Sequence, residues 1–267
     1  MSALIAVYRA QFALSLSNWF AYRVGMLFWF LVRIVEPLIY ISVWGAIAQS
    51  NSGTVGNFTP GDLAAYYIAL MIANQMTFLG LIGLWGYRVR TGALSSYLLR
   101  PVSLLHRDLA NLLANKAITA VFIVPAIFIM ALLFQPTLIL SAVNIIGFLF
   151  ALVMAFLVRF LLESIVGMAA FWITRMDAAE QLYAVILFFF SGRIAPLVLL
   201  PDWMQTVANG LPFRWILSFP VEVMLGRLSS QAMLTGFIVQ GLWLVFLLVS
   251  LPFIWQACLK RYTGVDG

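Results

Sequence analysis

Long apolar runs, separated by short polar segments, make up most of this chain. A transmembrane helix needs about 20 predominantly apolar residues, and six runs reach that length. They cover residues 20–48, 61–85, 111–134, 141–172, 178–200 and 233–258. The pattern predicts an all-α integral membrane protein. Its single transmembrane domain, residues 1–267, would hold a six-span bundle over 20–258 and a cytoplasmic tail over 259–267.

Composition supports this interpretation and narrows the expected partners. Hydrophobic residues make up 64% of the 267 positions and charged residues 9%, whereas soluble domains are about 25% charged. Mean hydropathy is +1.04. The net charge of +6 comes from basic residues dispersed over short loops, without the clustered stripe that nucleic-acid binding requires. We therefore expect the lipid bilayer as a partner, and no nucleic acid. The single cysteine, Cys258, excludes an intrachain disulfide.

The distribution of arginine and lysine predicts the orientation. Short cytoplasmic loops retain these residues, and most of them fall in segments 1–19, 86–116, 173–177 and 259–267. Segments 49–60 and 135–140 hold none, while the long segment 192–232 holds Arg193, Arg214 and Arg227. An even number of spans then places both termini in the cytoplasm. No cleavage site follows a short apolar core near the N-terminus, so the first span is expected to be the insertion signal.

Residues 1–19 carry a loose helical stripe of Leu4, Tyr8, Phe12 and Trp19. The stripe predicts a helix that lies flat in the membrane interface; the alternative is a plain extension of the first span.

In the second span, Gly80, Gly83 and Gly86 recur every three residues, which favours close helix packing. Pro37, Pro125, Pro196 and Pro252 fall inside spans, where proline kinks or breaks a helix.

Residues 92–109 form a long, charged segment between two strongly apolar runs. Helix-to-helix connections commonly need only about 2 to 8 residues, so a longer segment indicates a surface that binds something. Its apolar residues recur near helical spacing, which predicts an amphipathic segment. Pro101 disfavours helix at the preceding residue and suits the first turn of a new one. We expect one short helix ending near Leu99 and a second beginning at Pro101.

The order G-x-L-x-x-Y-L-L-x-P-V-S, over residues 92–103, resembles the segment between the second and third spans of ABC-2-type permeases. These are the membrane subunits of ATP-binding-cassette exporters. In that family the segment is the coupling helix, which docks into a groove on the ATPase and transmits its closure to the membrane helices. The resemblance assigns ATPase coupling to Gly92, Leu94, Tyr97, Leu98, Arg100, Pro101, Leu105 and Arg107. The alternative is a surface helix on the inner leaflet, attracted by its arginines.

Residues 201–232 contain too many prolines and charges for a span, yet they are too apolar for a solvated loop. A broken hairpin of short helices fits, provided that its backbone is buried in protein. The spacing from "LPDW" to "GLPF" is similar to that of the extracellular re-entrant helices which ABC-2 permeases place between spans five and six. This resemblance assigns an outer gate to Pro201, Trp203, Pro212 and Arg214. The tryptophan equally fits an interface anchor.

Two pairs of opposite charges lie inside predicted spans. Arg33 and Glu36 are three residues apart, and Arg159 and Glu163 are four apart, so each pair shares a helix face. A lone charge at mid-bilayer would cost about 2.5–3.5 kcal/mol. Either these four residues line a substrate pathway or each pair fixes helix packing; the pattern does not distinguish the two.

The chain has no G-x-x-x-x-G-K-[ST] loop, the usual cradle for nucleotide phosphates, so ATP and Mg²⁺ are expected on a separate ATPase subunit. Its sole histidine, His106, and the absence of H-E-x-x-H argue against a metalloenzyme, and no metal or cofactor is expected on this chain. An ion-coupled carrier using the embedded charges or a non-transporting scaffold are the alternatives.

The resemblance implies more than the residues alone. The partners would be ABC ATPase subunits and a second permease, identical or paralogous. The complex would export a small apolar or amphipathic molecule, drug-like, lipid or glycan-linked, across the bacterial plasma membrane.

Overall fold

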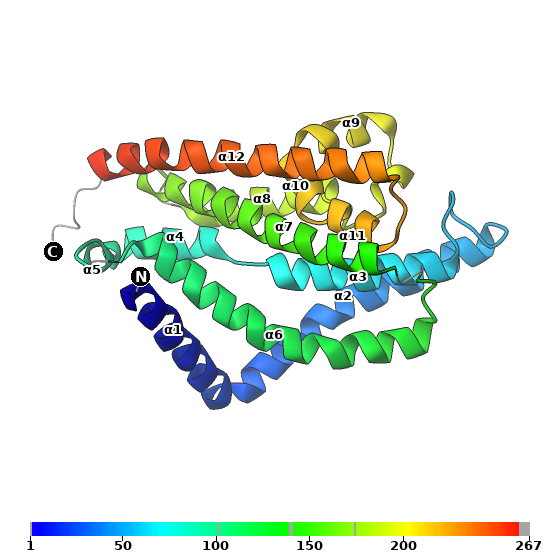
Figure 1. Cartoon of the computed structure of the whole chain (residues 1–267), viewed down its shortest axis with the longest axis horizontal. Coiled ribbons are helices and arrows are strands. Elements are labelled where there is room, and N and C mark those ends of the chain that lie inside the picture. The colour runs from blue at the N-terminus through cyan, green and yellow to red at the C-terminus, as the bar shows by residue number, and fades with distance from the viewer. Residues whose placement is uncertain (1, 101, 139–140, 174, 262–267) are drawn as a thin grey trace.

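The computed structural model describes residues 2–100, 102–138, 141–173 and 175–261, without the side chains at 2–4, 23, 26, 27, 29, 30 and 33. Helices make up most of this part of the chain (Figure 1). The α-helices are α1 Ser2–Ala21, α2 Arg23–Ser50, α3 Pro60–Thr77, α4 Leu81–Arg90, α5 Leu94–Leu98, α6 Leu104–Phe134, α7 Ala142–Met168, α8 Met176–Phe190, α9 Asp202–Gly210, α10 Pro212–Ile216, α11 Ser218–Met224 and α12 Ser230–Arg261. Short 3-10 turns, η1 Ala169–Phe171 and η2 Leu197–Leu199, follow α7 and α8.

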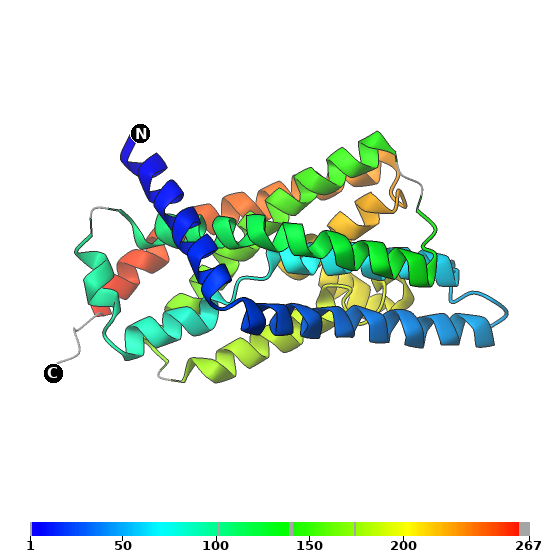
Figure 2. The same cartoon turned by 90° about the horizontal axis from the view of Figure 1, so that it is seen from below.

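The long helices run side by side along one axis (Figures 1 and 2). One end of the bundle, called here the α5 end, carries α5, the start of α6 and the end of α12. The opposite end carries the loop that joins α2 to α3 and the helices α9 and α11. α3 and α7 form the centre, with fully buried side chains such as Tyr66, Tyr67 and Val158.

Local sequence signals set where several of these helices begin. α3 starts with a capping box, in which the Thr59 hydroxyl accepts from the Asp62 N–H and the Asp62 carboxylate accepts from the Thr59 N–H. Pro60 occupies the first helical position, where its missing N–H costs nothing. α6 begins at Leu104 because the Ser103 hydroxyl caps it by accepting from the His106 N–H. The helix expected to begin at Pro101 therefore starts three residues later, and Pro101 itself lies outside the described residues.

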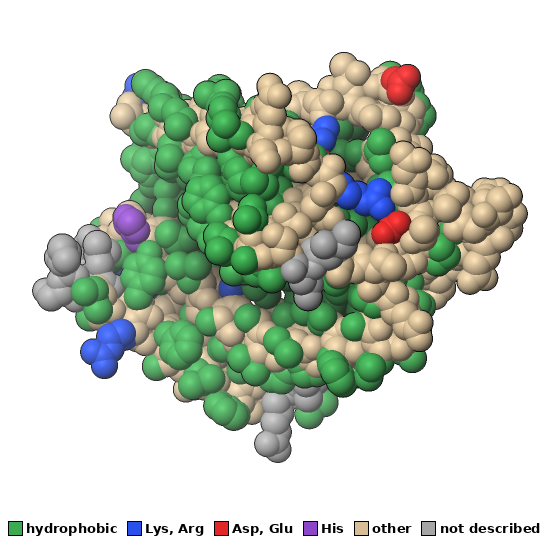
Figure 3. Space-filling view, turned by 45° about the vertical axis from the view of Figure 1, so that its right-hand side comes forward, with side chains coloured by type: hydrophobic (Ala, Val, Ile, Leu, Met, Phe, Trp, Pro, Cys, Tyr) green, Lys and Arg blue, Asp and Glu red, His purple; other side chains and the backbone are tan. Residues whose placement is uncertain are grey.

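Apolar side chains cover the outside of the bundle as well as its centre. On the face in Figure 3, hydrophobic side chains run over the helical body and charged side chains are few. Leu133 of α6, Ile146 of α7 and Phe253 of α12 are each more than half exposed. Exposed apolar surface on this scale matches a hydrocarbon environment. The protein is therefore a multi-pass membrane protein.

Four stretches of the described chain are long and apolar enough to cross a bilayer: 60–90, 104–134, 142–171 and 230–261. A shorter apolar stretch, Ile34–Ser50, lies in α2. The prediction that the fifth span extends to residue 200 is wrong, because the helix found there is shorter. α8 stops at Phe190, and Gly192 adopts a φ of +80°, so the chain turns inside the bundle.

α1 is a separate helix. The chain bends at Tyr22, and α1 packs against α6 rather than continuing the axis of α2 (Figure 2). Trp19 stacks on Phe122 with ring centroids 4.9 Å apart, and the Gln11 amide donates to Asn111 Oδ1 at 3.1 Å. The alternative of a plain extension of the first span is wrong. The expected flat placement in the interface stays a prediction.

Two of the three regularly spaced glycines pack closely against α8, as expected. A Cβ at Gly86 would lie 2.7 Å from Met176 Cβ, and one at Gly83 would lie 2.8 Å from Glu180 Oε2. Pro37, Pro125 and Pro252 remain inside continuous helices.

Candidate functional site

The second expected span, 61–85, is not one continuous helix. α3 ends at Thr77, α4 begins at Leu81, and Gly80 between them adopts a left-handed φ of +70°. A helix end leaves carbonyl or N–H groups without partners inside the helix. Inside a membrane protein those groups need partners from the protein itself. The break over residues 78–80 therefore requires polar side chains around it.

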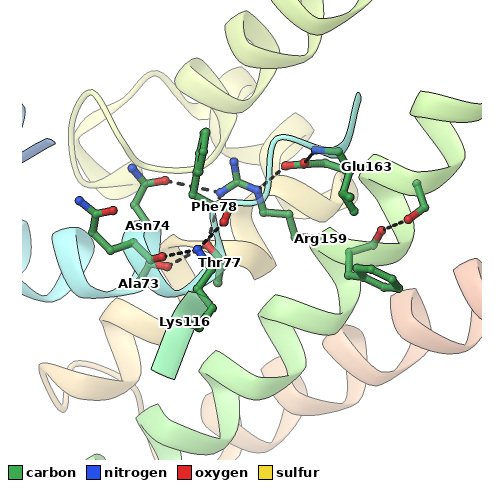
Figure 4. Close-up of polar contacts among 11 residues, drawn as sticks. Ala73, Asn74, Thr77, Phe78, Lys116, Arg159 and Glu163 are labelled. Carbon is green, nitrogen blue, oxygen red and sulfur yellow. Dashed lines mark hydrogen bonds and ion pairs between the residues drawn. The ribbon is translucent and has the colours of Figure 1, made fainter. Parts of the chain in front are cut away.

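Charged side chains from α6 and α7 meet both ends of the break (Figure 4). Lys116 Nζ donates to the Gln75 carbonyl at 2.7 Å and also to the Phe78 carbonyl. Glu163 Oε2 accepts from the Leu81 N–H at 3.1 Å. The cation thus lies at the C-terminal end of α3 and the anion at the N-terminal end of α4. Helix dipoles favour this arrangement.

Arg159 connects these groups. Its Nε donates to Glu163 Oε1 at 2.7 Å, and its Nη1 donates to Thr77 Oγ1 at 3.3 Å and to Asn74 Oδ1 at 3.5 Å (Figure 4). Arg159 is 4% exposed and Glu163 2%, so removing either partner would leave a buried charge uncompensated. The predicted pairing within α7 is confirmed. The pair also holds the broken ends of α3 and α4 together.

The other predicted pair has a different geometry. Both carboxylate oxygens of Glu36 accept from Arg193, from Nε at 2.6 Å and from Nη2 at 2.5 Å. The side chain of Arg33 lies outside the described residues. Arg193, counted above with the long segment 192–232, lies just after the end of α8, and its side chain is partly buried. Arg193 lies 157 positions away from Glu36 in the chain. Residue spacing along one helix therefore could not predict this ion pair.

The non-helical segment after α8 is held by hydrogen bonds to its carbonyls. The Tyr66 hydroxyl donates to the Gly192 carbonyl at 2.7 Å. The Tyr67 hydroxyl, at 2.9 Å, and Trp44 Nε1, at 3.0 Å, both donate to the Ile194 carbonyl. These bonds satisfy irregular backbone in the bundle interior, which lipid would not do.

A cavity of about 230 Å³ lies beside the broken helix. Helices α2, α3, α4, α7 and α8 contribute to its walls, together with the non-helical residues between α3 and α4 and after α8. Its lining residues are Val32, Glu36, Asn74, Phe78, Gly80, Ile82, Arg159, Glu163, Glu180, Tyr183, Ala184, Leu187 and Arg193. Three of the four expected pathway residues, Glu36, Arg159 and Glu163, therefore line one cavity.

At the α5 end, a short helix is anchored by its inner face. Leu94 is fully buried, and Gly92 before α5 adopts a φ of +69°, which favours glycine. Tyr97 lies against three guanidinium groups, with Arg88 and Arg107 4.9 Å and Arg100 5.5 Å from its ring centroid. The predicted short helix ending near Leu99 is confirmed by α5.

Arg88 connects α5 to its neighbours. It forms a buried two-bond pair with Asp108 of α6, in which both N–O distances are 2.6 Å. Since Arg88 belongs to α4 and also contacts Tyr97, one side chain joins α4, α5 and α6. Through Arg88, α5 is therefore connected to the short helix α4 and to the start of the long helix α6.

The residues assigned to coupling do not all face outward. Leu98 and Arg100 are exposed, while Leu105 and Arg107 are half-buried. Leu99, absent from the assigned set, is the most exposed of these side chains, at 89%. The exposed apolar surface of the segment therefore lies at the end of α5, at Leu98 and Leu99, next to the exposed Arg100.

The residues assigned to an outer gate fall into two places. Pro201 and Trp203 are exposed at the start of α9. Pro212 is buried, and Arg214 donates to Glu222 Oε2 at 3.0 Å. α10 and α11 are packed inside the protein, where buried Gln240 of α12 donates to the Ala151 and Trp215 carbonyls. The prediction of short helices in residues 201–232 is confirmed by α9, α10 and α11. A cavity of about 450 Å³ lies at this end, and Arg214 is the only one of the four assigned gate residues among its described lining residues.

Sequence reasoning missed Lys116, Arg193 and Asp108, and it named Leu99 in the motif without assigning it to coupling. Lys116 was counted with the cytoplasmic charges, although it reaches a broken helix from the next span. A lysine one helical turn inside an apolar run was the available signal for it. For Arg193 the available signal was Gly192 and Pro196 flanking it.

Comparison with protein families gives one match. A family model described as ABC-2 family transporter protein matches residues 34–265, from within α2 to beyond the end of α12. Comparison with curated proteins gives no match. The family match covers nearly the whole bundle, including the broken helix, α5 and the short helices before α12. The chain therefore belongs to the ABC-2 family, and it is a transport permease, the membrane subunit of an ATP-binding-cassette transporter.

Proposed function

We propose that this permease exports a small apolar or amphipathic molecule, drug-like, lipid or glycan-linked, driven by ATP hydrolysis on partner subunits. It would lie in a bacterial plasma membrane with six spans and both termini in the cytoplasm. The α5 end would face the cytoplasm. Two membrane halves, identical or paralogous, would stand above two ATPase subunits, which hold the ATP and Mg²⁺.

The construction of α5 is the observation that carries this proposal. Leu94 and Tyr97 anchor its inner face, while Leu98, Leu99 and Arg100 project from the end of the bundle. A leucine that is 89% exposed beside an arginine suits insertion into a groove on another protein. Such a surface suits docking to another protein, because side chains so exposed contribute little to the packing of this chain.

The same geometry supplies a path for force. A push on α5 reaches α4 through the contact of Tyr97 with Arg88, and α4 ends at the break over residues 78–80. Because α3 and α4 are separate helices, α4 is able to tilt while α3 stays packed in the centre. The cavity lies at the junction, so tilting changes its shape and supports alternating access.

The second membrane half would close the open side of this cavity. Apolar side chains on both walls point outward there: Leu31 and Val35 on α2, and Leu182 and Val185 on α8, are each about half exposed or more. Pairing two copies across α2 and α8 would enclose a shared pathway. The cavity around Arg214 at the other end would then serve as the outer gate.

Co-purification tests the proposal without knowledge of the substrate. The tagged permease, purified from cells that make the whole transporter, should bring vanadate-sensitive ATP hydrolysis with it. Leu99→Asp should remove that activity, because a carboxylate replaces the exposed apolar tip. Val198→Asp is the matched control for ATPase binding: Val198 is also exposed, at 65%, but it lies in η2 beside the cavity that contains Arg214, away from α5.

Each rival function predicts another result. An ion-coupled carrier or a scaffold would purify without hydrolysis activity, and Leu99→Asp would then change nothing. Equal loss of activity in both variants would show that any added carboxylate disrupts the complex, and would contradict docking at α5.

A further inference from the structure

The cavity beside the broken helix carries one carboxylate in excess. Glu36 is paired with Arg193, and Glu163 with Arg159. Glu180 of α8 lines the same cavity, and no further lysine or arginine is among its described lining residues. A carboxylate held within a membrane bundle normally has a partner. Here the described residues that line the cavity do not supply one.

The surroundings of Glu180 make a cation the matching partner. Its Oε2 lies against α4, where Gly83 leaves room for it. Glu163 of α7 lines the same cavity, so a second carboxylate lies near Glu180. Both arginines of the described lining are already paired with other carboxylates, so Glu180 adds a net negative charge there, which favours a cation.

A second polar group lines the cavity. Tyr183 lies one turn after Glu180 on α8 and is 8% exposed. Its hydroxyl lies close to the paired Arg159 and Glu163. A ligand in the cavity would therefore meet a hydroxyl as well as the Glu180 carboxylate.

The remaining walls are apolar. Val32, Phe78, Ile82, Ala184 and Leu187 line the cavity between the charged groups. Metal ions such as Mg²⁺ and Ca²⁺ need about six or more oxygen ligands, which these walls do not provide. An organic cation with an apolar body matches both features, since aromatic rings such as those of Phe78 and Tyr183 attract cationic groups.

We infer that this cavity binds small organic cations, with Glu180 as their counter-ion and the Tyr183 hydroxyl as a hydrogen-bond partner. The inference rests on the proposed transport function, because it makes this cavity the loading site and names the substrate class. It assigns specificity to a residue that the charge pairs of the sequence did not single out.

Binding of benzyltrimethylammonium tests the inference directly. The full-length permease in lipid nanodiscs, without any ATPase subunit, is titrated with the radiolabelled cation. Wild type should bind it, and excess unlabelled cation should displace it, whereas benzyl alcohol and benzenesulfonate should not. Glu180→Gln should weaken binding about tenfold or more, because a charge-assisted contact is lost. Tyr183→Phe should weaken it by a smaller factor, and Glu180→Asp should retain part of the affinity.

Asp177→Asn is the matched control. Asp177 lies on the same helix, one turn before Glu180, and undergoes the same charge change, but it is exposed and does not line the cavity. It should bind as wild type does. Each variant is checked for an unchanged elution volume and melting temperature. The inference is wrong if wild type does not bind the cation, if Glu180→Gln binds equally well, or if Asp177→Asn loses as much affinity.

Failure here is distinguishable from failure of the proposed function. The binding measurement needs no ATPase, so it leaves the co-purification result untouched. A permease that brings hydrolysis activity with it but ignores the cation would remain an ATP-driven transporter with a different substrate class.

Discussion

Lys116 shows how one side chain stabilises irregular backbone in an apolar bundle. Its ammonium group donates hydrogen bonds to the Gln75 and Phe78 carbonyls at the end of α3. A buried acceptor left without a partner costs about 1–3 kcal/mol. At the start of α4, the Glu163 carboxylate accepts a hydrogen bond from the Leu81 N–H. The stability of the break over residues 78–80 thus depends on a few side-chain atoms.

Lys116→Met should lower the stability of the protein. The substitution keeps the approximate length of the side chain but removes its hydrogen bonds to two carbonyls, so the free energy of unfolding should fall by about 1–3 kcal/mol. Thermal unfolding of the detergent-solubilised protein measures this as a lower melting temperature. Lys260→Met, at the exposed end of α12, is the control and should change little. Equal melting temperatures for the two variants would show that Lys116 does not support the break.

α4 and α5 act as one element in this account. α4 is ten residues long, begins at the break, and is joined to α5 by the contact of Arg88 with Tyr97. The buried bond of Arg88 to Asp108 fixes the start of α6 to the same unit. Tyr97 therefore transmits movement as well as anchoring α5.

Tyr97→Leu should uncouple ATP hydrolysis from transport while subunit assembly persists. The exposed tip stays in place, but contacts with three guanidinium groups, each worth roughly 0.5–1 kcal/mol, are lost. Molecules moved per ATP hydrolysed, measured in proteoliposomes with the complete transporter, should fall about threefold or more. Tyr97→Phe keeps the ring and should retain coupling. Loss of coupling in both variants would assign the effect to the hydroxyl rather than to the stacked arginines.

The elements that sequence reasoning predicted well are those with local signals. α5 lies between Gly92 and Pro101, and the pair of Arg159 and Glu163 is four residues apart on one helix. The break over residues 78–80 had no comparable signal, because its stabilising groups come from α6 and α7. The pair of Glu36 and Arg193 likewise depends on how far α8 extends. Contacts between distant helices decide such features, and a hydropathy pattern does not contain them.

At the scale of the whole molecule, the protein is a bundle with two different ends. The α5 end presents an exposed apolar tip, while the opposite end is closed by packed short helices and by ion pairs such as Arg227 with Asp62, 3.1 Å apart. Between them lies a cavity where a broken helix meets α8. This asymmetry suits a transporter that is driven by its partner at the α5 end and releases its cargo at the opposite end.

Site-specific photo-crosslinking tests the central claim, that a separate ATPase drives the bundle through α5. A photoreactive amino acid is placed at position 99 or at position 198 in cells that make the complete transporter, and captured proteins are identified by mass spectrometry. The account predicts that position 99 captures a subunit with a nucleotide-binding loop and that position 198 does not. Capture of that subunit at position 198 instead of position 99 would contradict it.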